Sequence, residues 1–112
     1  MPKNMSFMLT TEQIKNRTKT VTRRSGWVFL KPGDIVNAVE KGQGLKKGEK
    51  IKHICQIRIL SIRSEPLNII TKEECIKEGF PAMSPEDFIN MYRDHNRVFA
   101  YTHVNRIEFE YV

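Results

Sequence analysis

The pattern of apolar and polar positions predicts the strands of this chain. Residues 104–112 alternate three apolar residues with two glutamates, which predicts a strand with one buried face. Residues 54–62 carry apolar side chains on both faces, so this strand is expected to be buried on both sides or to contain a bulge. Residues 19–24 and 35–40 are also expected to be strands, because their β-branched and aliphatic residues pack well on a pleated sheet.

Two short helices are predicted from the spacing of capping residues. Thr10 is followed three residues later by Gln13, and Thr71 by Glu74. Both pairs have the spacing of a capping box, which predicts helices from residue 10 to about 16 and from residue 71 to about 78. Gly79 is expected to end the second helix, since glycine accepts the left-handed conformation that closes many helices.

A third helix is predicted after residue 84. Ser84 is a favourable N-cap and Pro85 a favourable first helical residue. Phe88, Met91 and Tyr92 then follow at helical spacing and form one apolar stripe. Such a stripe is more often part of a core than of a ligand site.

The segments between these elements are predicted from their turn and loop residues. Residues 1–9 are expected to be a tail that ends in an apolar entry strand, with Phe7, Met8 and Leu9 against the core. Residues 31–34, Lys-Pro-Gly-Asp, are typical of a turn. Residues 41–50 contain three glycines and four lysines, which predicts an exposed, flexible loop. Its tip is also able to sweep over a ligand, an alternative that stays open.

Several strands and two or three short helices in 112 residues predict a single α+β domain over residues 1–112. Whether the sheet closes into a barrel does not follow from periodicity. No apolar run approaches the roughly 20 residues that cross a bilayer, and the N-terminus lacks the apolar core of a signal peptide. Cys55 and Cys75 are too few for a disulfide framework, which favours a reducing compartment. The three histidines show no metal-ligand spacing, so we predict neither a metal nor another cofactor.

Charge is distributed unevenly along the chain. The net charge is +6, and residues 1–56 carry 12 Lys and Arg against 4 Asp and Glu, whereas residues 57–112 carry 7 against 9. A basic half favours a nucleic acid or another polyanion as partner, through counterion release and electrostatic steering. A basic surface that serves only solubility is the alternative.

The most basic strand runs from Lys19 to Arg24 and contains three cations and three β-branched residues, with Trp27 shortly after it. Cations beside an aromatic ring suit a phosphate or a nucleobase, so Arg23, Arg24 and Trp27 are candidate substrate-binding residues. Arg24 shares a face with Thr22 and offers a planar fork to a phosphate or a base edge. The alternative is a solvated edge strand that carries charge to prevent pairing with other chains.

Three residues are candidates for chemistry. Glu78 lies in the last turn of a predicted helix, where the negative helix end disfavours a carboxylate by about 0.3–1 kcal/mol, so it is either held there for function or simply solvated. A cation such as Lys19 is one partner that would explain it. Lys19, if buried beside other cations, loses its proton more easily and is then able to activate the Thr22 hydroxyl. In a regular strand these two residues point to opposite faces, so they converge only if Lys19 lies at the strand's entry or beside a bulge.

The basic strand also carries a family resemblance. Residues 16–24, NRTKTVTRR, resemble the G-x-K-x-x-T-x-R motif of ASCH-domain proteins. Lys19, Thr22 and Arg24 match its K-x-x-T-x-R core, whereas Asn16 or Arg17 stands where glycine is usual.

Three further segments support the resemblance in the same order along the chain. Residues 31–34 are similar to the family's P/K-G-D turn, Glu78-Gly79-Phe80 to its E-G-F helix end, and residues 104–109 to its closing strand. The resemblance implies a small PUA-like β-barrel with two or three short flanking helices, a cleft that faces RNA or a nucleotide, and a cytoplasmic location.

The small ASCH proteins of this length include N4-acetylcytidine amidohydrolases. The resemblance implies a catalytic set of Lys19, Thr22 and Glu78 and a modified nucleoside or RNA as substrate. Other ASCH proteins are RNA-binding modules or are linked to ribonuclease activity. An amidohydrolase, a non-catalytic RNA-binding module and a ribonuclease therefore remain as alternatives at this point.

Overall fold

The computed structural model describes residues 2–42 and 44–112. In chain order the elements are β1 (Asn4–Ser6), the 3-10 helix η1 (Met8–Thr10), α1 (Thr11–Lys15), β2 (Val21–Arg24), β3 (Ile35–Val39), β4 (His53–Pro66), the 3-10 helix η2 (Leu67–Ile69), α2 (Lys72–Lys77), α3 (Pro85–Asn96) and β5 (His103–Tyr111). The α+β class, with short helices beside one sheet, is confirmed.

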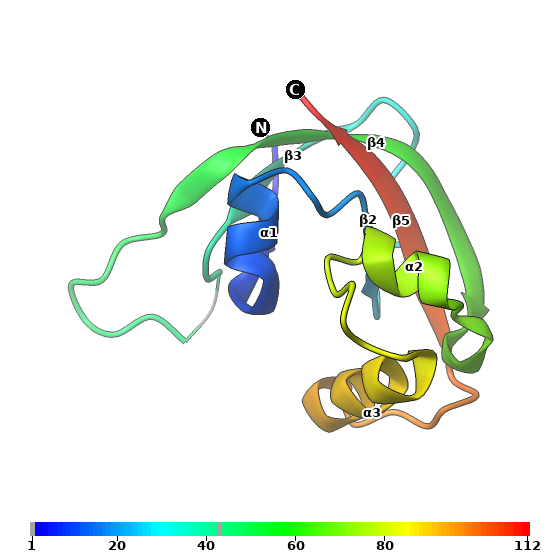
Figure 1. The fold of residues 1–112 in the computed structure, drawn as a ribbon. Helices are drawn as coiled ribbons and strands as arrows, with labels where there is room; N and C mark the ends of the chain where they lie inside the picture. Colours follow the sequence, from blue (N-terminus) through cyan, green and yellow to red (C-terminus); the bar gives the residue numbers. More distant parts are fainter. Residues whose placement is uncertain (1, 43) are drawn as a thin grey trace.

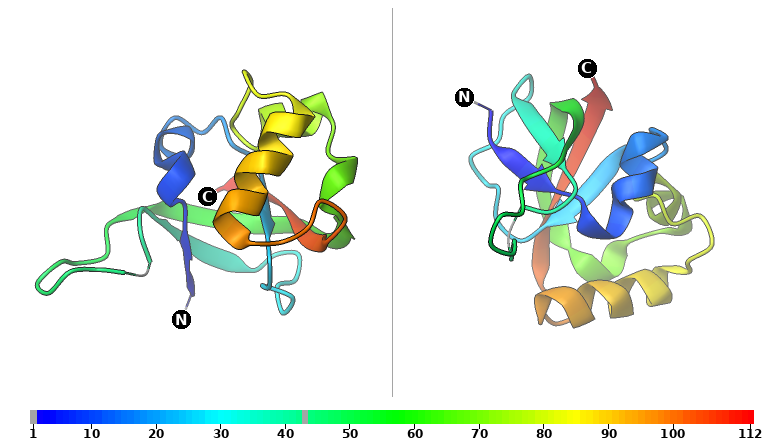
Figure 2. Two further views of the ribbon diagram at one scale, coloured as in Figure 1. Left: turned by 90° about the horizontal axis from the view of Figure 1, so that it is seen from below. Right: turned by 90° about the vertical axis from the view of Figure 1, so that its left-hand side faces the viewer.

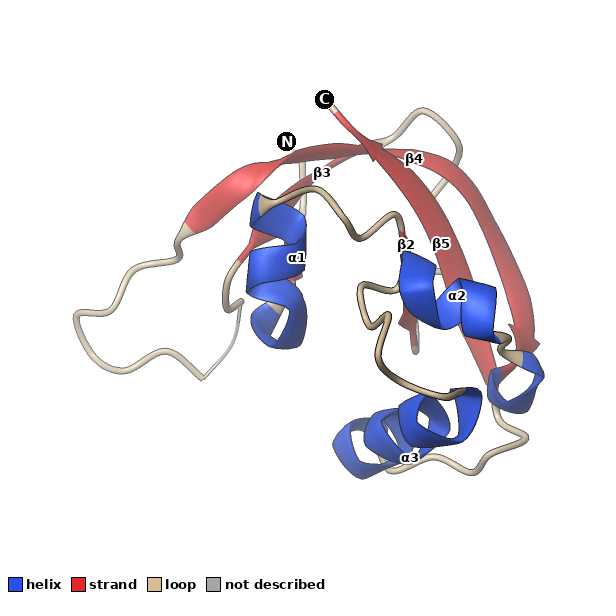
Figure 3. Cartoon of the chain, viewed as in Figure 1, coloured by secondary structure: helices blue, strands red, loops and turns tan. Residues whose placement is uncertain are grey.

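The five strands form one sheet in the order β1-β3-β4-β5-β2, in which β1 and β3 are parallel and the other pairs antiparallel. The long strands β4 and β5 arch over the molecule, and the helices lie beneath the arch (Figure 1). The same arrangement is visible when the chain is coloured by element type (Figure 3). Strands β1 and β2 are thus the two edges of the strongly curved sheet.

A bulge in β4 explains why apolar residues occupy both faces of residues 54–62. The register with β5 shifts between Ile59 and Ser61, and Leu60 is 43% exposed while Ile59 is fully buried. Of the two expected alternatives, burial on both sides or a bulge, the structure shows the bulge. The strand continues to Pro66, beyond the predicted end, because residues 63–66 pair with the first residues of β5. This extension is polar and therefore lacks the alternation from which strands are predicted.

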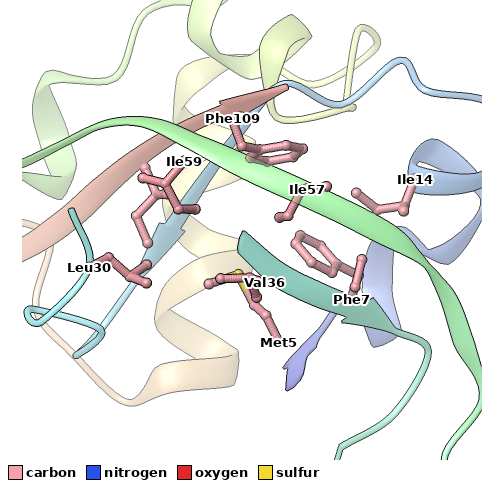
Figure 4. Packing of buried hydrophobic residues seen from close by; sticks show 10 residues of the cluster. Met5, Phe7, Ile14, Leu30, Val36, Ile57, Ile59 and Phe109 are labelled. Atoms are coloured by element: carbon pink, nitrogen blue, oxygen red, sulfur yellow. The ribbon is translucent and has the colours of Figure 1, made fainter. Parts of the chain in front are cut away.

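Two apolar clusters form the core. The first fills the inside of the curved sheet and includes Phe7 and Phe109, whose ring centroids are 6.0 Å apart (Figure 4). The second lies between α2, α3 and the start of β5 and includes Phe88 and Tyr92. Burial of these side chains removes apolar surface from water and stabilises the fold.

The predicted packing of the N-terminal segment is only partly right. Phe7 is buried, but Met8 and Leu9 are 57% and 49% exposed, so their predicted place against the core is wrong. The backbone turns into η1 at residue 8, and the alternation of an extended strand no longer applies.

The three predicted helix starts have different outcomes. Ser84 is the N-cap of α3 and Pro85 lies in its first turn, as predicted, and Asp87 completes a reciprocal capping box with Ser84. The Thr71 hydroxyl accepts a hydrogen bond from the backbone N–H of Glu74, so that N-cap is also confirmed. Helix α1 does follow Thr10, as predicted, but the predicted capping box is wrong, because the Thr10 side chain makes no capping hydrogen bond.

The remaining features of the fold are seen best from other directions. Residues 44–52 extend away from the body of the molecule, and α3 lies along one side of it (Figure 2). Within the described part of the chain, no helix has the length and apolar character needed to cross a membrane.

Candidate functional site

A cavity of about 220 Å³ lies where β2, the end of α2, η1 and one face of α3 meet. Lys19, Thr22, Arg24 and Glu78 bring polar groups to its lining. Its apolar lining comes from aromatic and methionine side chains that include Phe7, Met8, Phe80, Phe88 and Met91. A cavity of this kind, mostly apolar with a few converging polar groups, is the usual form of a small-molecule site.

The structure brings Lys19, Thr22 and Glu78 together in this cavity. Strand β2 begins at Val21, so Lys19 precedes the regular strand and its side chain is free of the strict alternation. This is the entry position that the sequence required for Lys19 and Thr22 to converge. All three side chains are buried, with exposures of 2%, 3% and 2% for Lys19, Thr22 and Glu78.

Lys19 is held by Glu78 in two ways. Its Nζ donates to the Glu78 carboxylate Oε1 and to the Glu78 backbone carbonyl, each at 2.7 Å. Burial lowers the pKa of the Lys19 amine from its ordinary value, and the Arg23 and Arg24 charges lower it further, while Glu78 raises it. A neutral amine has two N–H bonds and one lone pair. If both N–H bonds point to Glu78, the lone pair is left to accept a proton.

Hydrogen bonds at the end of α2 explain why the Glu78 carboxylate is tolerated at the negative end of this helix. Three successive carbonyls there accept hydrogen bonds from the segment before β2. They are Lys77 O from Thr20 N at 2.8 Å, Glu78 O from Lys19 Nζ at 2.7 Å and Gly79 O from Gln13 Nε2 at 3.1 Å. These donors satisfy carbonyls that a helix end leaves open, and the Lys19 amine also donates a hydrogen bond to the Glu78 side chain.

Arg24 connects the Thr22 hydroxyl to the edge of the sheet. Its Nε donates to Thr22 Oγ1 at 3.1 Å and its Nη2 donates to the Ser6 carbonyl at 2.6 Å. Its guanidinium carbon lies 4.7 Å from the centre of the Phe7 ring, a cation–π arrangement. Arg24 therefore fixes the orientation of the Thr22 hydroxyl and links the two edge strands.

Arg23 faces a different environment from its neighbour. It contributes to the lining of the cavity, but its guanidinium contacts the carboxylates of Glu65, Glu74 and Glu78 at 2.9–3.1 Å. Its side chain is 1% exposed. Arg106 contacts Glu74 from the other side, so the ion pairs form one connected network.

Trp27, the third candidate for substrate binding, is not part of the lining of this cavity. It packs against the first apolar cluster, with its ring 5.5 Å from that of Phe29. The structure thus separates Trp27 from the other candidates.

The face of α3 is the part of the site that the sequence did not reveal. Phe88 and Tyr92 belong to the second apolar cluster, as their stripe suggested, and they also line the cavity together with His95 and Asn96. The Tyr92 hydroxyl lies 3.3 Å from the Ser25 hydroxyl at the end of β2. Periodicity identifies the buried face of a helix, but it does not tell a core face from a cavity wall.

The described residues contain no recognisable set of metal ligands. Among residues 2–42 and 44–112, no three His, Cys, Asp or Glu side chains cluster so as to hold a metal ion. The acids nearest the cavity are instead paired with Arg and Lys.

Comparison with solved structures identifies the fold. The hypothetical protein PH0355 is 24% identical with a TM-score of 0.67 over the whole of both chains. Protein EF3133 from Enterococcus faecalis V583 is 15% identical with a TM-score of 0.70, over all of this chain and 80% of the other. An ASCH domain from Lactobacillus crispatus JV V101 is 15% identical with a TM-score of 0.69, over 97% of this chain and 78% of that domain.

The protein therefore has an ASCH-like fold, that is, a small α+β fold of the PUA-like type. No family model matches the sequence. No curated protein shows significant sequence similarity to it.

Proposed function

We propose that the protein is a hydrolase that removes the N-acyl group from a modified cytidine such as N4-acetylcytidine. One observation carries the proposal: a buried lysine amine held by a carboxylate and a hydroxyl held by an arginine line the same cavity. A nucleophilic hydroxyl needs a nearby base, and this base has a lowered pKa. The resemblance of residues 16–24 to the ASCH motif supports the same residues.

The first half of the reaction uses Thr22 and Lys19. The Thr22 oxygen attacks the acyl carbonyl carbon while its proton passes to the neutral Lys19 amine. The resulting tetrahedral intermediate collapses, the C–N bond to the cytosine N4 breaks, and Lys19 returns the proton to the leaving nitrogen. The products of this half are cytidine and an acyl ester on Thr22.

The second half consumes one water molecule. Lys19 takes a proton from water, the hydroxide attacks the ester carbonyl, and the proton returns to Thr22 as the carboxylic acid leaves. Glu78 orients Lys19 throughout by accepting its hydrogen bonds. Arg24 holds the Thr22 oxygen in place through its Nε hydrogen bond, which also favours developing negative charge on that oxygen.

The size of the cavity supports a small substrate. Its volume of about 220 Å³ is below the roughly 300–1,000 Å³ of pockets for drug-sized ligands. One base with a short acyl group suits this space better than a bulky acyl chain. The aromatic lining offers faces for the planar base.

The test is to incubate the protein with N4-acetylcytidine and to follow the release of cytidine by mass. We expect the parent to release cytidine, Thr22→Val to release none, and Thr22→Ser to keep part of the rate because it keeps the hydroxyl. Thr22→Val preserves the β-branched shape, so its fold should remain intact by circular dichroism. Equal rates in the parent and Thr22→Val would contradict the assignment of Thr22.

A non-catalytic RNA-binding module is the second candidate. The basic first half of the chain favours it, with 12 Lys and Arg against 4 Asp and Glu in residues 1–56. Binding alone does not need a buried acid that holds a lysine in the cavity. A parent that binds RNA but releases no cytidine would favour this second candidate.

A further inference from the structure

We propose that Arg23 is a positioning residue: it fixes the Glu78 carboxylate against Lys19 and does not bind substrate. The consequence for catalysis rests on the proposed function. The effect of Arg23 on the protonation of the Lys19 amine does not rest on the proposed function, and it can be measured without substrate.

The two oxygens of Glu78 are divided between two cations. Oε1 accepts from Lys19 Nζ at 2.7 Å and Oε2 accepts from Arg23 Nη1 at 3.0 Å. A carboxylate at the end of a flexible side chain rotates about its last bond when only one oxygen is bound. With both oxygens bound, the plane of the carboxylate is fixed, and the oxygen that faces Lys19 is fixed with it.

Arg23 is itself held from the far side. Its Nη2 donates to Glu65 at 3.1 Å and to Glu74 at 2.9 Å, and Arg106 Nη2 donates to the other Glu74 oxygen at 3.1 Å. The guanidinium therefore acts as a rigid fork between the cavity wall and the sheet.

Little of Arg23 is left for a ligand. Its Nε is the buried side-chain polar atom without a hydrogen-bond partner in the described residues, and it is closed to solvent as well. A substrate in the cavity does not reach an atom that water does not reach. Position and burial thus argue against the role in substrate binding that the basic strand suggests.

The charges around Lys19 make the proposal measurable. The groups that act on its amine are Glu78 from the end of α2 and Arg23 and Arg24 from β2, while Tyr111 of β5 contacts only its backbone carbonyl. Glu78 favours the charged amine and the two arginines oppose it. Loss of the Arg23 charge should therefore raise the pKa of the Lys19 amine.

The experiment compares Arg23→Met, Arg23→Lys and a control, Arg63→Met. Arg63 belongs to the same network and has the same charge, but it contacts only Glu65 and its side chain is 63% exposed. For each variant, kcat and KM for N4-acetylcytidine are measured as a function of pH. The titration of the Lys19 amine is followed by NMR without substrate.

A positioning role predicts a specific combination of results. Arg23→Met should lower kcat by about 10²-fold, the scale expected when a catalytic group is misplaced, and leave KM unchanged. The limb in which the rate rises with pH should move to higher pH, as should the Lys19 titration. Arg23→Lys should restore the pH limb, because it restores the charge, and recover kcat in part. Arg63→Met should resemble the parent.

Two outcomes would overturn the proposal. A raised KM with unchanged kcat and pH limb in Arg23→Met would make Arg23 a substrate ligand. An unmoved Lys19 titration would show that Arg23 does not act on Lys19, and this result counts even if the parent does not hydrolyse the substrate. If Arg23→Met does not fold, Glu74→Gln takes its place. Glu74 does not line the cavity, and Arg23 is the one cavity-lining residue to which it is hydrogen-bonded. Glu74→Gln should lower kcat without raising KM, and a parent-like kcat would count against the proposal.

Discussion

Replacement of Gly79 by alanine should disturb the joint between the end of α2 and the segment before β2. Gly79 has a φ of +97°, and a Cβ built on it would lie 2.8 Å from Gln13 Cγ and 3.0 Å from Gln13 Cβ. Gln13 is also the residue whose side-chain amide caps the Gly79 carbonyl, at 3.1 Å. An alanine therefore has to push away the group that holds this helix end.

The expected cost has two parts. An L-residue in the left-handed conformation costs about 1–2 kcal/mol. Displacement of Gln13 adds about 1 kcal/mol for the lost hydrogen bond. Gly79→Ala should therefore destabilise the protein by about 2–3 kcal/mol. Gly33 is the matched control, because its φ is +96° and a Cβ there would meet nothing within 4 Å. Gly33→Ala should cost the first part only.

Urea unfolding of four proteins tests this reasoning: the two glycine variants, Gln13→Ala and the double variant Gln13→Ala/Gly79→Ala. In the double variant the contact with Gln13 Cγ and the capping bond are already absent. Gly79→Ala should therefore cost about 1 kcal/mol less in that background than in the parent. Equal losses for Gly33→Ala and Gly79→Ala, or additivity of Gln13→Ala and Gly79→Ala within about 0.3–0.5 kcal/mol, would refute the argument.

Three further outcomes are expected. Glu78→Gln should destabilise the protein by about 3–5 kcal/mol in urea unfolding, because Lys19 stays buried without its carboxylate and Arg23 loses one of its three, and a neutral or stabilising effect would contradict this. The pKa of Glu74 is lowered from 4.5 to about 2, mainly by its hydrogen bonds with Arg106. The stabilising effect of its carboxylate should therefore be complete above pH 4.5 and be lost as the pH falls toward 2. The urea midpoint of Glu74→Gln should vary less over this pH range than the midpoint of the parent. Any affinity for RNA should fall steeply with salt, and a dissociation constant that is flat from low to high salt would exclude an electrostatic contact.

The Glu78→Gln expectation shows how the structure changes an argument from sequence. A carboxylate at the C-terminal end of a helix is locally unfavourable, so its removal is expected to be slightly stabilising. The local argument omits Lys19 and Arg23, which lie 59 and 55 residues earlier in the chain. The long-range ion pairs outweigh the helix-end effect, and no local pattern indicates them.

The strands β2 to β5 and the three helix starts were predictable because their signals are local. The N-caps Thr71 and Ser84 each depend on residues within a few positions of one another. The predicted Thr10–Gln13 capping box had the same spacing and is absent: the Thr10 side chain makes no capping hydrogen bond, and the Gln13 amide donates instead to the Gly79 carbonyl, 66 residues away. Spacing alone does not show which partner a side chain takes.

The candidate site was predictable in part for a similar reason. Lys19 and Thr22 were identifiable as chemistry-bearing residues, and the possibility that Lys19 lies at the strand entry followed from the geometry of strands. The distinction between Arg23 and Arg24 did not follow, although they are adjacent and identical in type. One contacts three carboxylates and the other a hydroxyl and a carbonyl, since successive strand residues face opposite sides.

The link between the two edges of the sheet determines where the molecule opens locally. Strands β1 and β2 stand at the ends of the strand order, and the Arg24 side chain reaches from one to the Ser6 carbonyl at the other. A seam joined by a side chain opens at lower cost than a ladder of backbone hydrogen bonds, so local opening should begin there. Ser6 and Thr22 both line the cavity, and a bound ligand would touch both sides of the seam. Ligand binding should therefore slow hydrogen exchange along β1 and β2 more than in the centre of the sheet, which couples occupancy of the pocket to closing of the seam between these two edge strands.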